Sequence, residues 1–338
     1  MPEVIWIRRL ALVGAILCFG VVVLGGYTRL SDSGLGCPDW PGCFGHVAPT
    51  GAAEHYATPA DVRKAWTEMI HRYAASTLGL LILVIAALSV CARRGTRVSV
   101  GFCLTLLALV VFQGILGMWT VTWLLKPLVV TGHLLGGLTT FGMLLWLWLT
   151  LRATSMPVDG VSVRNGNRLV EAGARARTWA GLALAALALQ VFLGGWTSSN
   201  YAAVACPDFP RCQAQWIPEA DYRDAFVLWR GLGINYAGGV LDHPARVAIH
   251  FSHRLGAVLA SILLLLAAHA ALRRLGPGPR WAGIAVLAAL VLQISIGIFM
   301  VWRAFPLPLA AAHNAGAALL VAATVWLNRN LRPVADFQ

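Results

Sequence analysis

Residues 25–43 read GGYTRLSDSGLGCPDWPGC, and residues 194–212 read GGWTSSNYAAVACPDFPRC. The two stretches align without a gap and share the pattern CPDxPxC. Further parallel pairs follow in the same order: IHRYAASTLG (70–79) and SHRLGAVLAS (252–261), QGILGMWTV (113–121) and QISIGIFMV (293–301), TGHLLGGL (131–138) and AAHNAGAA (311–318). Such ordered similarity indicates an internal duplication, which predicts two halves of the same architecture. The offset rises from 169 to 182 after the cysteine-containing stretch, so the second copy of that loop is longer by 13 residues.

The composition is that of an integral membrane protein. Of the 338 residues, 58% are hydrophobic and only 12% are charged, and the mean hydropathy is +0.71. A soluble domain needs more polar surface than this, and a transmembrane helix needs about 20 apolar residues. We therefore predict an all-α integral membrane protein with eight transmembrane helices. The predicted spans are Ile5–Gly26, Trp66–Cys91, Val98–Trp119, Leu128–Leu151, Thr178–Thr197, Arg246–Leu272, Trp281–Val301 and Leu309–Leu327.

The net charge of +12 is distributed in a way that predicts topology rather than nucleic-acid binding. If the N-terminus is cytoplasmic, the inner segments carry 15 of the 26 basic residues but only 4 of the 14 acidic ones. Lys and Arg accumulate on the cytoplasmic side of membrane proteins. We therefore expect both termini in the cytoplasm and both cysteine-containing loops outside. No small-residue cleavage site is evident after the first apolar run, which predicts an uncleaved first helix.

Two sets of four spans predict two tandem four-helix bundles in the same orientation. The predicted units are an N-terminal bundle (residues 1–151), a cytoplasmic linker (152–177) and a C-terminal bundle (178–338). The linker is rich in arginine and has no long apolar run, so we expect a surface connection. Parallel repeats also occur in transporters, which keeps a transporter among the candidate functions.

Four cysteines frame the repeated loops, at Cys37 and Cys43 and at Cys206 and Cys212. Disulfides persist outside the cytoplasm, and the prolines between the members of each pair favour a tight turn. Pairing within each loop is therefore the simplest expectation. Two alternatives stay open from the sequence. The four thiols could form a metal site, although five intervening residues is not a usual zinc spacing, or they could be redox-active.

Four histidines lie at matched depths in the predicted spans. His71 and His133 lie about five residues into the second and fourth spans, and His253 and His313 repeat this in the sixth and eighth. An ionisable side chain inside a membrane is costly and is usually functional, although a single histidine would also fit a hydrogen-bonded packing role. Four of them, paired within each half, favour two sites in which facing imidazoles ligate a haem iron. Small residues after His133 and His313 leave room for a flat macrocycle.

The halves differ one turn before the first histidine of each pair, where Glu68 precedes His71 but His250 occupies the equivalent position. Glu68 either complements the helix dipole or acts as an acid–base group beside a reactive haem edge. Zinc and a di-iron centre are the metal alternatives. The di-iron centre is disfavoured because it needs about four carboxylates. Arg72 and Arg254 each follow a ligand candidate, and they either contact haem propionates or extend to the membrane interface.

Three glutamines share a spacing, because Gln113, Gln190 and Gln293 each precede a glycine by four residues. We interpret this pattern as helix packing rather than chemistry. It therefore adds nothing to the predicted sites.

Together these features resemble the haem A synthase family, membrane enzymes that convert haem O to haem A for terminal oxidases. The resemblance covers essentially the whole chain. Besides the duplicated spans and the two cysteine pairs, it is carried by EMIHR (68–72), TGH (131–133), HR (253–254) and AAHNAG (311–316). The cysteine pairs match the form of the family found in many bacteria. With 24 Arg against 2 Lys and no transit peptide, we expect a bacterial cytoplasmic (inner) membrane.

The resemblance implies a reaction and a set of roles. A methyl group of the porphyrin is oxidised to a formyl group by successive hydroxylations and loss of water. His253 and His313 are then the ligands of a haem b cofactor, His71 and His133 are those of the substrate haem, and Glu68 is the acidic residue near the substrate. The implied partners are haem O as substrate, haem O synthase, an electron carrier and the lipid bilayer.

Two other functions stay open from the sequence. A di-haem b-type electron-transfer cytochrome explains the four histidines but gives Glu68 no role. A haem transporter explains the duplication but not the paired histidines at one depth.

Overall fold

The computed structural model describes residues 2–51, 58–92, 98–153, 166–274 and 277–332, and these residues are helical with connecting loops. Eight long helices run through them. They are α1 (Pro2–Leu30), α3 (Pro59–Cys91), α4 (Val100–Thr122), α5 (Pro127–Ala153), α6 (Gly166–Ser199), α8 (His243–Leu272), α9 (Pro277–Trp302) and α10 (Leu307–Asn330). Short helices occupy the loops at η1 (Pro49–Gly51), η2 (Ala203–Ala205) and α7 (Tyr222–Ala225). The predicted all-α fold is confirmed.

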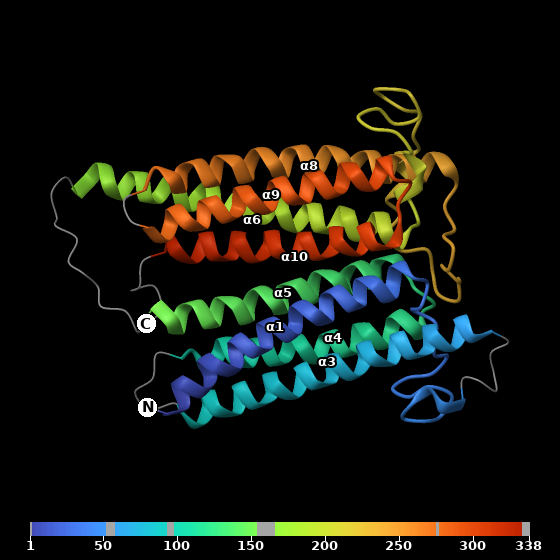
Figure 1. Ribbon diagram of the computed structural model, residues 1–338, viewed down its shortest axis with the longest axis horizontal. Coiled ribbons are helices and arrows are strands. Elements are labelled where there is room, and N and C mark those ends of the chain that lie inside the picture. The colour runs from blue at the N-terminus through green and yellow to red at the C-terminus, as the bar shows by residue number, and fades with distance from the viewer. Residues whose placement is uncertain (1, 52–57, 93–97, 154–165, 275–276, 333–338) are drawn as a thin grey trace.

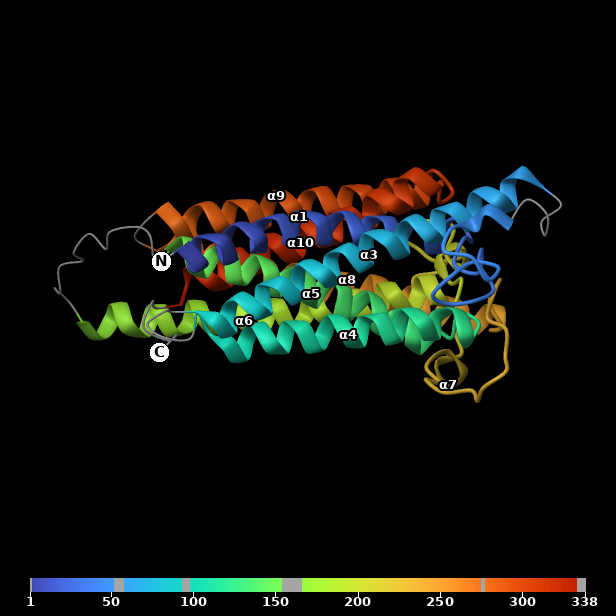
Figure 2. The same ribbon diagram turned by 90° about the horizontal axis from the view of Figure 1, so that it is seen from below.

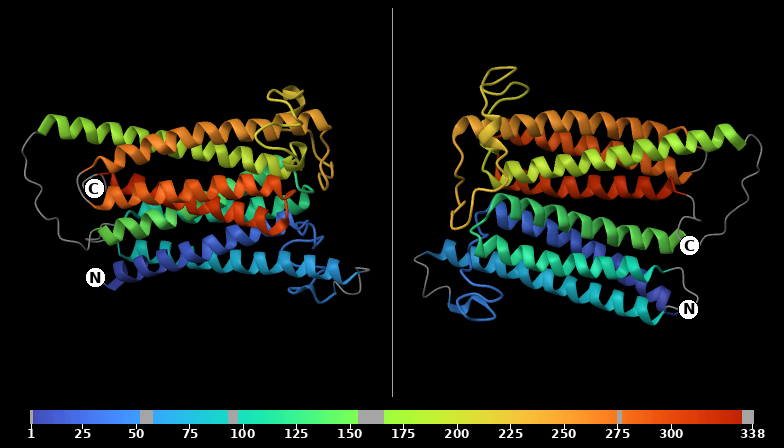
Figure 3. Two further views of the ribbon diagram at one scale, coloured as in Figure 1. Left: turned by 45° about the horizontal axis from the view of Figure 1, so that its top comes forward. Right: turned by 180° about the vertical axis from the view of Figure 1, so that it is seen from behind.

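The long helices form two bundles of four that lie side by side (Figure 1). In the first bundle α1 contacts α3 and α5, and α4 closes the ring between them. In the second, α6 contacts α8 and α10, and α9 closes the ring in the same way. The bundles meet through α5 with α10, α5 with α6, and α1 with α10, and both views in Figure 3 show this division. Equivalent helices of the two halves therefore occupy equivalent places.

All eight long helices of the described residues are long and apolar enough to cross a membrane. Their outward faces carry apolar side chains such as Ile16, Leu80 and Val291, which are 62% to 65% exposed. A stable water-facing surface would not be built this way, whereas lipid accommodates it. The chain is therefore a multi-pass membrane protein.

Both cysteine-containing loops lie at one end of the paired bundles, as Figures 1 and 2 show. The first residues of α1 and the last residues of α10 lie at the opposite end. This arrangement follows from an even number of helices in each half, because each bundle starts and finishes at the same end.

Several helices are longer than their apolar cores. The helix α3 begins at Pro59 rather than at Trp66, because the Thr58 hydroxyl caps its first turn by accepting from the Asp61 N–H. The helix α6 begins twelve residues before its predicted start, at Gly166, inside the predicted linker 152–177. Alanine and arginine in this stretch favour a helix without being apolar enough to mark a span. Residues 154–165 of the predicted linker and residues 333–338 lie outside the described part of the chain.

A segment of the longer second loop, residues 226–241, crosses to the N-terminal bundle, and we call it the outer strap. The buried Lys126 ammonium donates to the carbonyl of Gly231 and lies 3.4 Å from the centroid of the Trp229 ring. The Tyr236 N–H donates to the carbonyl of Leu124 at 3.0 Å. The outer strap therefore ties the α4–α5 turn to the loop that precedes α8.

Candidate functional site

Each of the four intramembrane histidines packs against a glycine of a neighbouring helix. A Cβ atom added at any of these glycines would lie only 2.7 to 3.5 Å from the imidazole. At Gly25, Gly194 and Gly297 this distance is 3.1 Å or less, so a larger residue would push the ring away, whereas at Gly117 it is an ordinary van der Waals contact. The pairs are His71 with Gly25, His133 with Gly117, His253 with Gly194, and His313 with Gly297.

The histidines are brought together in two pairs, one within each bundle. The ring centroids of His71 and His133 are 6.4 Å apart and the rings are nearly perpendicular, at 86°. In the other bundle His253 and His313 lie close enough to interact electrostatically. The depth matching in the sequence therefore predicted the right partners.

The residues present fit an iron held between two imidazoles. Metal–imidazole bonds of about 2 Å on each side place two ring centroids roughly 6 Å apart, close to the separation of His71 and His133. The buried Nδ1 atoms of His71, His133 and His313 have no hydrogen-bond partner among the described residues. A buried nitrogen without a partner destabilises the fold. A bond from one ring nitrogen to iron would therefore explain why these imidazoles are buried without hydrogen bonds. Within the described chain no group of three or more His, Cys, Asp or Glu gathers as a multidentate metal site would need.

The three glutamines do more than pack. The Gln190 amide nitrogen donates to the carbonyl of His253 at 3.0 Å and lies 3.0 Å from a nitrogen of the same imidazole. Gln293 repeats this with His313, at 3.1 Å to the carbonyl and 3.3 Å to the ring. The interpretation as helix packing was therefore incomplete, because two of these side chains contact ligand candidates directly.

The same glutamines fill the space beside the small residues that follow the histidines. A Cβ at Gly136 would overlap the Gln113 amide, and one at Gly316 would overlap that of Gln293. In the structure these two glycines therefore make room for a glutamine side chain.

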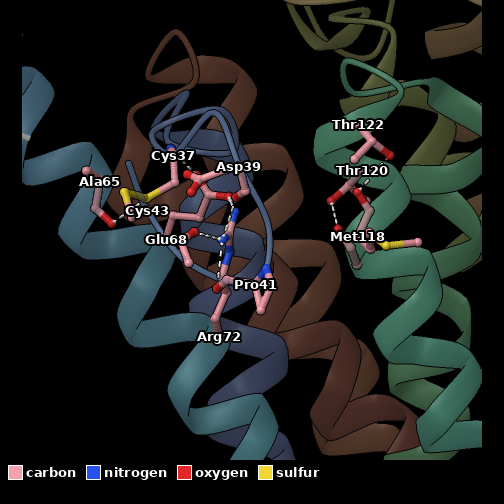
Figure 4. A network of polar contacts seen from close by, with 12 residues as sticks. Cys37, Asp39, Pro41, Cys43, Ala65, Glu68, Arg72, Met118, Thr120 and Thr122 are labelled. Atoms are coloured by element: carbon pink, nitrogen blue, oxygen red, sulfur yellow. Dashed lines mark hydrogen bonds and ion pairs between the residues drawn. A yellow bond between two sulfur atoms is a disulfide. The ribbon is translucent and has the colours of Figure 1, made fainter. Parts of the chain in front are cut away.

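Glu68 is buried and has a hydrogen-bond partner on each carboxylate oxygen. Arg72 donates to Oε1 at 2.6 Å, and the Cys37 N–H donates to Oε2 at 2.9 Å. Figure 4 shows the side chains of Glu68 and Arg72 pointing into the loop that the Cys37–Cys43 disulfide closes. Glu68 is therefore not a solvent-exposed residue that only complements the helix dipole, and it is not an acid without partners. Glu68 is a charged residue fixed between its own helix and the first disulfide loop.

Arg72 binds the loop as well as the carboxylate. Its guanidinium donates to the carbonyls of Asp39, Pro41 and Gly42 at 2.6 to 3.2 Å. In the second half Arg254 donates to the carbonyls of Cys206 and Arg211 at 2.9 and 2.7 Å. Both arginines therefore hold a disulfide loop, and neither needs a propionate to be satisfied.

In the second half, a histidine, His250, occupies the position equivalent to Glu68. The buried His250 accepts from the Arg254 guanidinium at 3.3 Å, and its ring packs edge-on against Phe305. It bridges its arginine to an aromatic ring and carries no carboxylate. The asymmetry between the halves, visible in the sequence, is therefore retained in the geometry.

The two disulfide loops share one internal design. Both Cys37–Cys43 and Cys206–Cys212 are disulfides, which confirms pairing within each loop. Because all four sulfurs are bonded in pairs, they do not form a thiolate metal site. In each loop an X–Pro bond is cis, at Pro41 and at Pro210.

An aspartate organises each loop from within. Asp39 accepts the N–H groups of Phe44 and Gly45, both at 2.7 Å, and Asp208 accepts those of Gln213 and Ala214 at 2.6 and 2.9 Å. Partial burial opposes ionisation, but these hydrogen bonds outweigh it and hold the pKa of both aspartates below its ordinary value. The repeated CPD sequence could have indicated this role, but the sequence alone led us to no role for its aspartate.

Comparisons with known proteins agree with the residues assembled here. The family model described as cytochrome oxidase assembly protein matches residues 8–325. A protein of Shewanella oneidensis named heme A synthase is 41% identical, covering 96% of both chains. Heme A synthases of Caulobacter vibrioides and Rhizorhabdus wittichii are 30% and 28% identical, and the alignments cover 98% and 94% of this chain and 97% and 91% of theirs.

Proposed function

This chain belongs to the family of cytochrome oxidase assembly proteins, and we propose that it is a haem A synthase with one resident and one substrate haem. It oxidises a porphyrin methyl group of haem O to a formyl group, which gives haem A for the assembly of terminal oxidases. The observation that carries this proposal is the duplicated pair of facing histidines with a carboxylate beside only one pair. Two equivalent bis-imidazole sites with unequal chemistry suit an enzyme that uses one haem to act on another.

We assign the substrate to the N-terminal bundle and the cofactor to the C-terminal bundle. His71 and His133 hold the substrate haem, because Glu68 lies one helical turn from His71. His253 and His313 hold haem b, because both are supported by a glutamine and face no carboxylate in the described residues. The resident haem supplies one-electron chemistry when it is bound.

Glu68 has the environment of a preorganised charge. Its Oε1 and Oε2 atoms are held by Arg72 and by the Cys37 N–H, so the carboxylate does not need to reorient during the reaction. A fixed anion here stabilises positive charge that develops near the methyl carbon. It also provides an oxygen that accepts a proton as the methyl group is oxidised. The ion pair with Arg72 favours the charged form of this carboxylate.

Orientation in the membrane completes the proposal. The end that carries Arg8, Arg9 and Arg152 is the cytoplasmic end, as the accumulation of basic residues there favours. The disulfide loops and Glu68 then lie at the outer surface of a bacterial cytoplasmic membrane. Haem O synthase and an electron carrier are the expected partners of the enzyme in this membrane.

The test is the pigment made by cells. We would express the chain with a source of haem O in bacteria that make no haem A, and separate the extracted haems by chromatography. Haem A is expected with the wild-type chain and is expected to be absent with His71→Ala. Accumulation of haem O alone, with folded wild-type protein in the membrane, would refute the proposed function.

A further inference from the structure

A reciprocal packing motif surrounds three of the four histidines. One helix carries Gln-x-x-x-Gly and its neighbour carries His-x-x-Gly. The glutamine lies over the glycine of the histidine helix, and the histidine lies over the glycine of the glutamine helix. The three instances are Gln113 and Gly117 with His133 and Gly136, Gln190 and Gly194 with His253 and Gly256, and Gln293 and Gly297 with His313 and Gly316.

The fourth histidine, His71, lacks the glutamine. Its imidazole still packs on Gly25, but Val21 stands where the glutamine would be, and Ala74 replaces the second glycine. The side chain of Val21 cannot hydrogen-bond, and the contact of Val21 with the His71 ring comes from its backbone. The Cβ of Ala74 would occupy the space that the amide takes in the other three motifs. His71 is therefore the one intramembrane histidine without an amide at this position.

The missing amide matters for ligation. An imidazole that binds a metal through one ring nitrogen carries a proton on the other, and a partner for that N–H fixes the ring and raises its basicity. Gln190 and Gln293 each have a buried Oε1 atom with no partner among the described residues. Their Nε2 atoms already anchor to the backbone of the histidine. Since an amide offers both a donor and an acceptor, it satisfies the ring in either protonation state.

We propose that Gln190 and Gln293 are positioning residues that fix His253 and His313 on a resident haem. By the same reasoning His71, which has no such glutamine, is the exchangeable ligand at which the substrate haem enters and leaves. The inference rests on the proposed function, because that function assigns the two haems to the two bundles. It adds a structural reason why one haem stays and the other turns over.

The resident site is tested with Gln190→Met and Gln293→Met, which keep the side-chain length but remove the amide. Haem loss to an excess of apo-globin would be followed by absorbance. Loss of a hydrogen-bond partner of this kind costs about 10–100-fold in metal affinity, so haem b should leave about 10–100-fold faster. The midpoint potential should rise in both methionine variants. It should fall in Gln190→Glu, which supplies a stronger acceptor in a similar shape.

The exchangeable ligand is tested by installing the motif. The double variant Val21→Gln with Ala74→Gly places an amide and its space beside His71. Haem A should then leave about 10–100-fold more slowly, so the purified protein should carry more haem A per chain. The matched control, Val21→Leu with Ala74→Gly, changes the same positions without adding an amide and should release haem A at the rate of Ala74→Gly alone.

Wild-type protein gives a further test that needs no substitution. Haem A should leave the loaded enzyme faster than haem b, and equal rates would overturn the assignment of His71. Unchanged haem loss and potential in both methionine variants would overturn the role of the glutamines. These outcomes differ from failure of the proposed function, in which the wild-type chain forms no haem A at all.

Discussion

The two disulfide loops are almost the same structure placed against two different partners. In each, an aspartate accepts two consecutive N–H groups and an arginine from the adjacent helix donates to loop carbonyls. The first loop, however, also donates its Cys37 N–H to Glu68. The second loop has no equivalent carboxylate that could accept its N–H, because His250 occupies that position and accepts from Arg254 instead.

This difference teaches how a duplicated scaffold can be given two roles. The helix order, the loop design and the histidine pairs are shared, and in the proposed function each half uses them to bind one haem. Three positions per half carry the divergence used here: Glu68 against His250 near the loop, and Val21 against Gln190 with Ala74 against Gly256 beside the histidine. We attribute chemistry and exchange to the first half and retention to the second.

Loss of a ligand should separate the halves most strongly. His253→Ala or His313→Ala should remove the low-spin b-type haem spectrum, because a bis-imidazole site loses one of its two bonds to iron. His71→Ala should keep that spectrum and lose haem A formation. The measurement is the reduced-minus-oxidised absorbance of purified protein, with His269→Ala, an exposed histidine on the same helix as His253, as control. An unchanged spectrum in both the His253 and His313 variants would contradict the assignment.

The next largest effect is expected at Glu68. Glu68→Gln keeps the shape but removes the charge, and a positioned acid–base group contributes about 10²–10⁴ in rate. Haem A output per folded protein should therefore fall by about that factor while haem b stays bound. Haem O, hydroxylated intermediates and haem A would be measured by chromatography.

The matched substitution in the other half is His250→Gln, which should leave turnover near the wild-type rate. If Glu68 only anchors the loop, its replacement should lower stability by about 1.5–3 kcal/mol, the usual contribution of a hydrogen bond to a charged group. Near wild-type haem A output from Glu68→Gln would then leave it a structural residue.

Removing the disulfides should give a smaller effect that still differs between halves. Each bond closes a short loop, so replacing both of its cysteines by serine should cost at most about 2–3 kcal/mol. The Cys37/Cys43 variant should also reduce turnover, because its loop positions the N–H that holds Glu68. Thermal unfolding and haem A output would be compared for both double variants. Equal losses of turnover from the two would argue against a link between the first loop and the chemistry.

The smallest effect concerns pH and should be the same in both loops. Hydrogen bonds from loop N–H groups lower the pKa of Asp39 and Asp208 in the folded state. A lowered pKa stabilises the fold above the unfolded pKa of about 3.9. That stability is lost as pH falls through the folded pKa. Asp39→Asn and Asp208→Asn should therefore show a shallower loss of thermal stability between pH 5 and 3, with the exposed Asp242→Asn as control.

Much of this architecture could be predicted from the sequence, because its causes are local or periodic. Apolar runs give the spans, and the repeat gives the two bundles. The matched depths of His71 and His133 correctly indicated that they meet. Helix ends were less predictable: α3 and α6 extend through polar turns whose residues favour helix without being apolar.

The partners of the site residues could not be predicted, because they come from distant parts of the chain. Glu68 meets an N–H group 31 residues away, and Gln190 meets a histidine 63 residues away. The spacing of Gln190 from Gly194 was visible, but which helix would face it depends on how the bundle closes. The contacts of Arg72 and Arg254 with the disulfide loops could not be predicted either, because the loop carbonyls that they bind follow no regular pattern in the sequence.

The outer strap has a consequence for how the protein is made. Lys126 is buried, yet the Gly231 carbonyl and the Trp229 ring that accept its charge are synthesised more than one hundred residues later. Until that loop is made, the N-terminal bundle lacks these two partners, and the Lys126 ammonium in the turn between α4 and α5 is bound by water. The outer strap replaces that water only after the loop before α8 has been made. The two halves, although copies, are not interchangeable modules, because the second half supplies the contacts that bury Lys126 of the first.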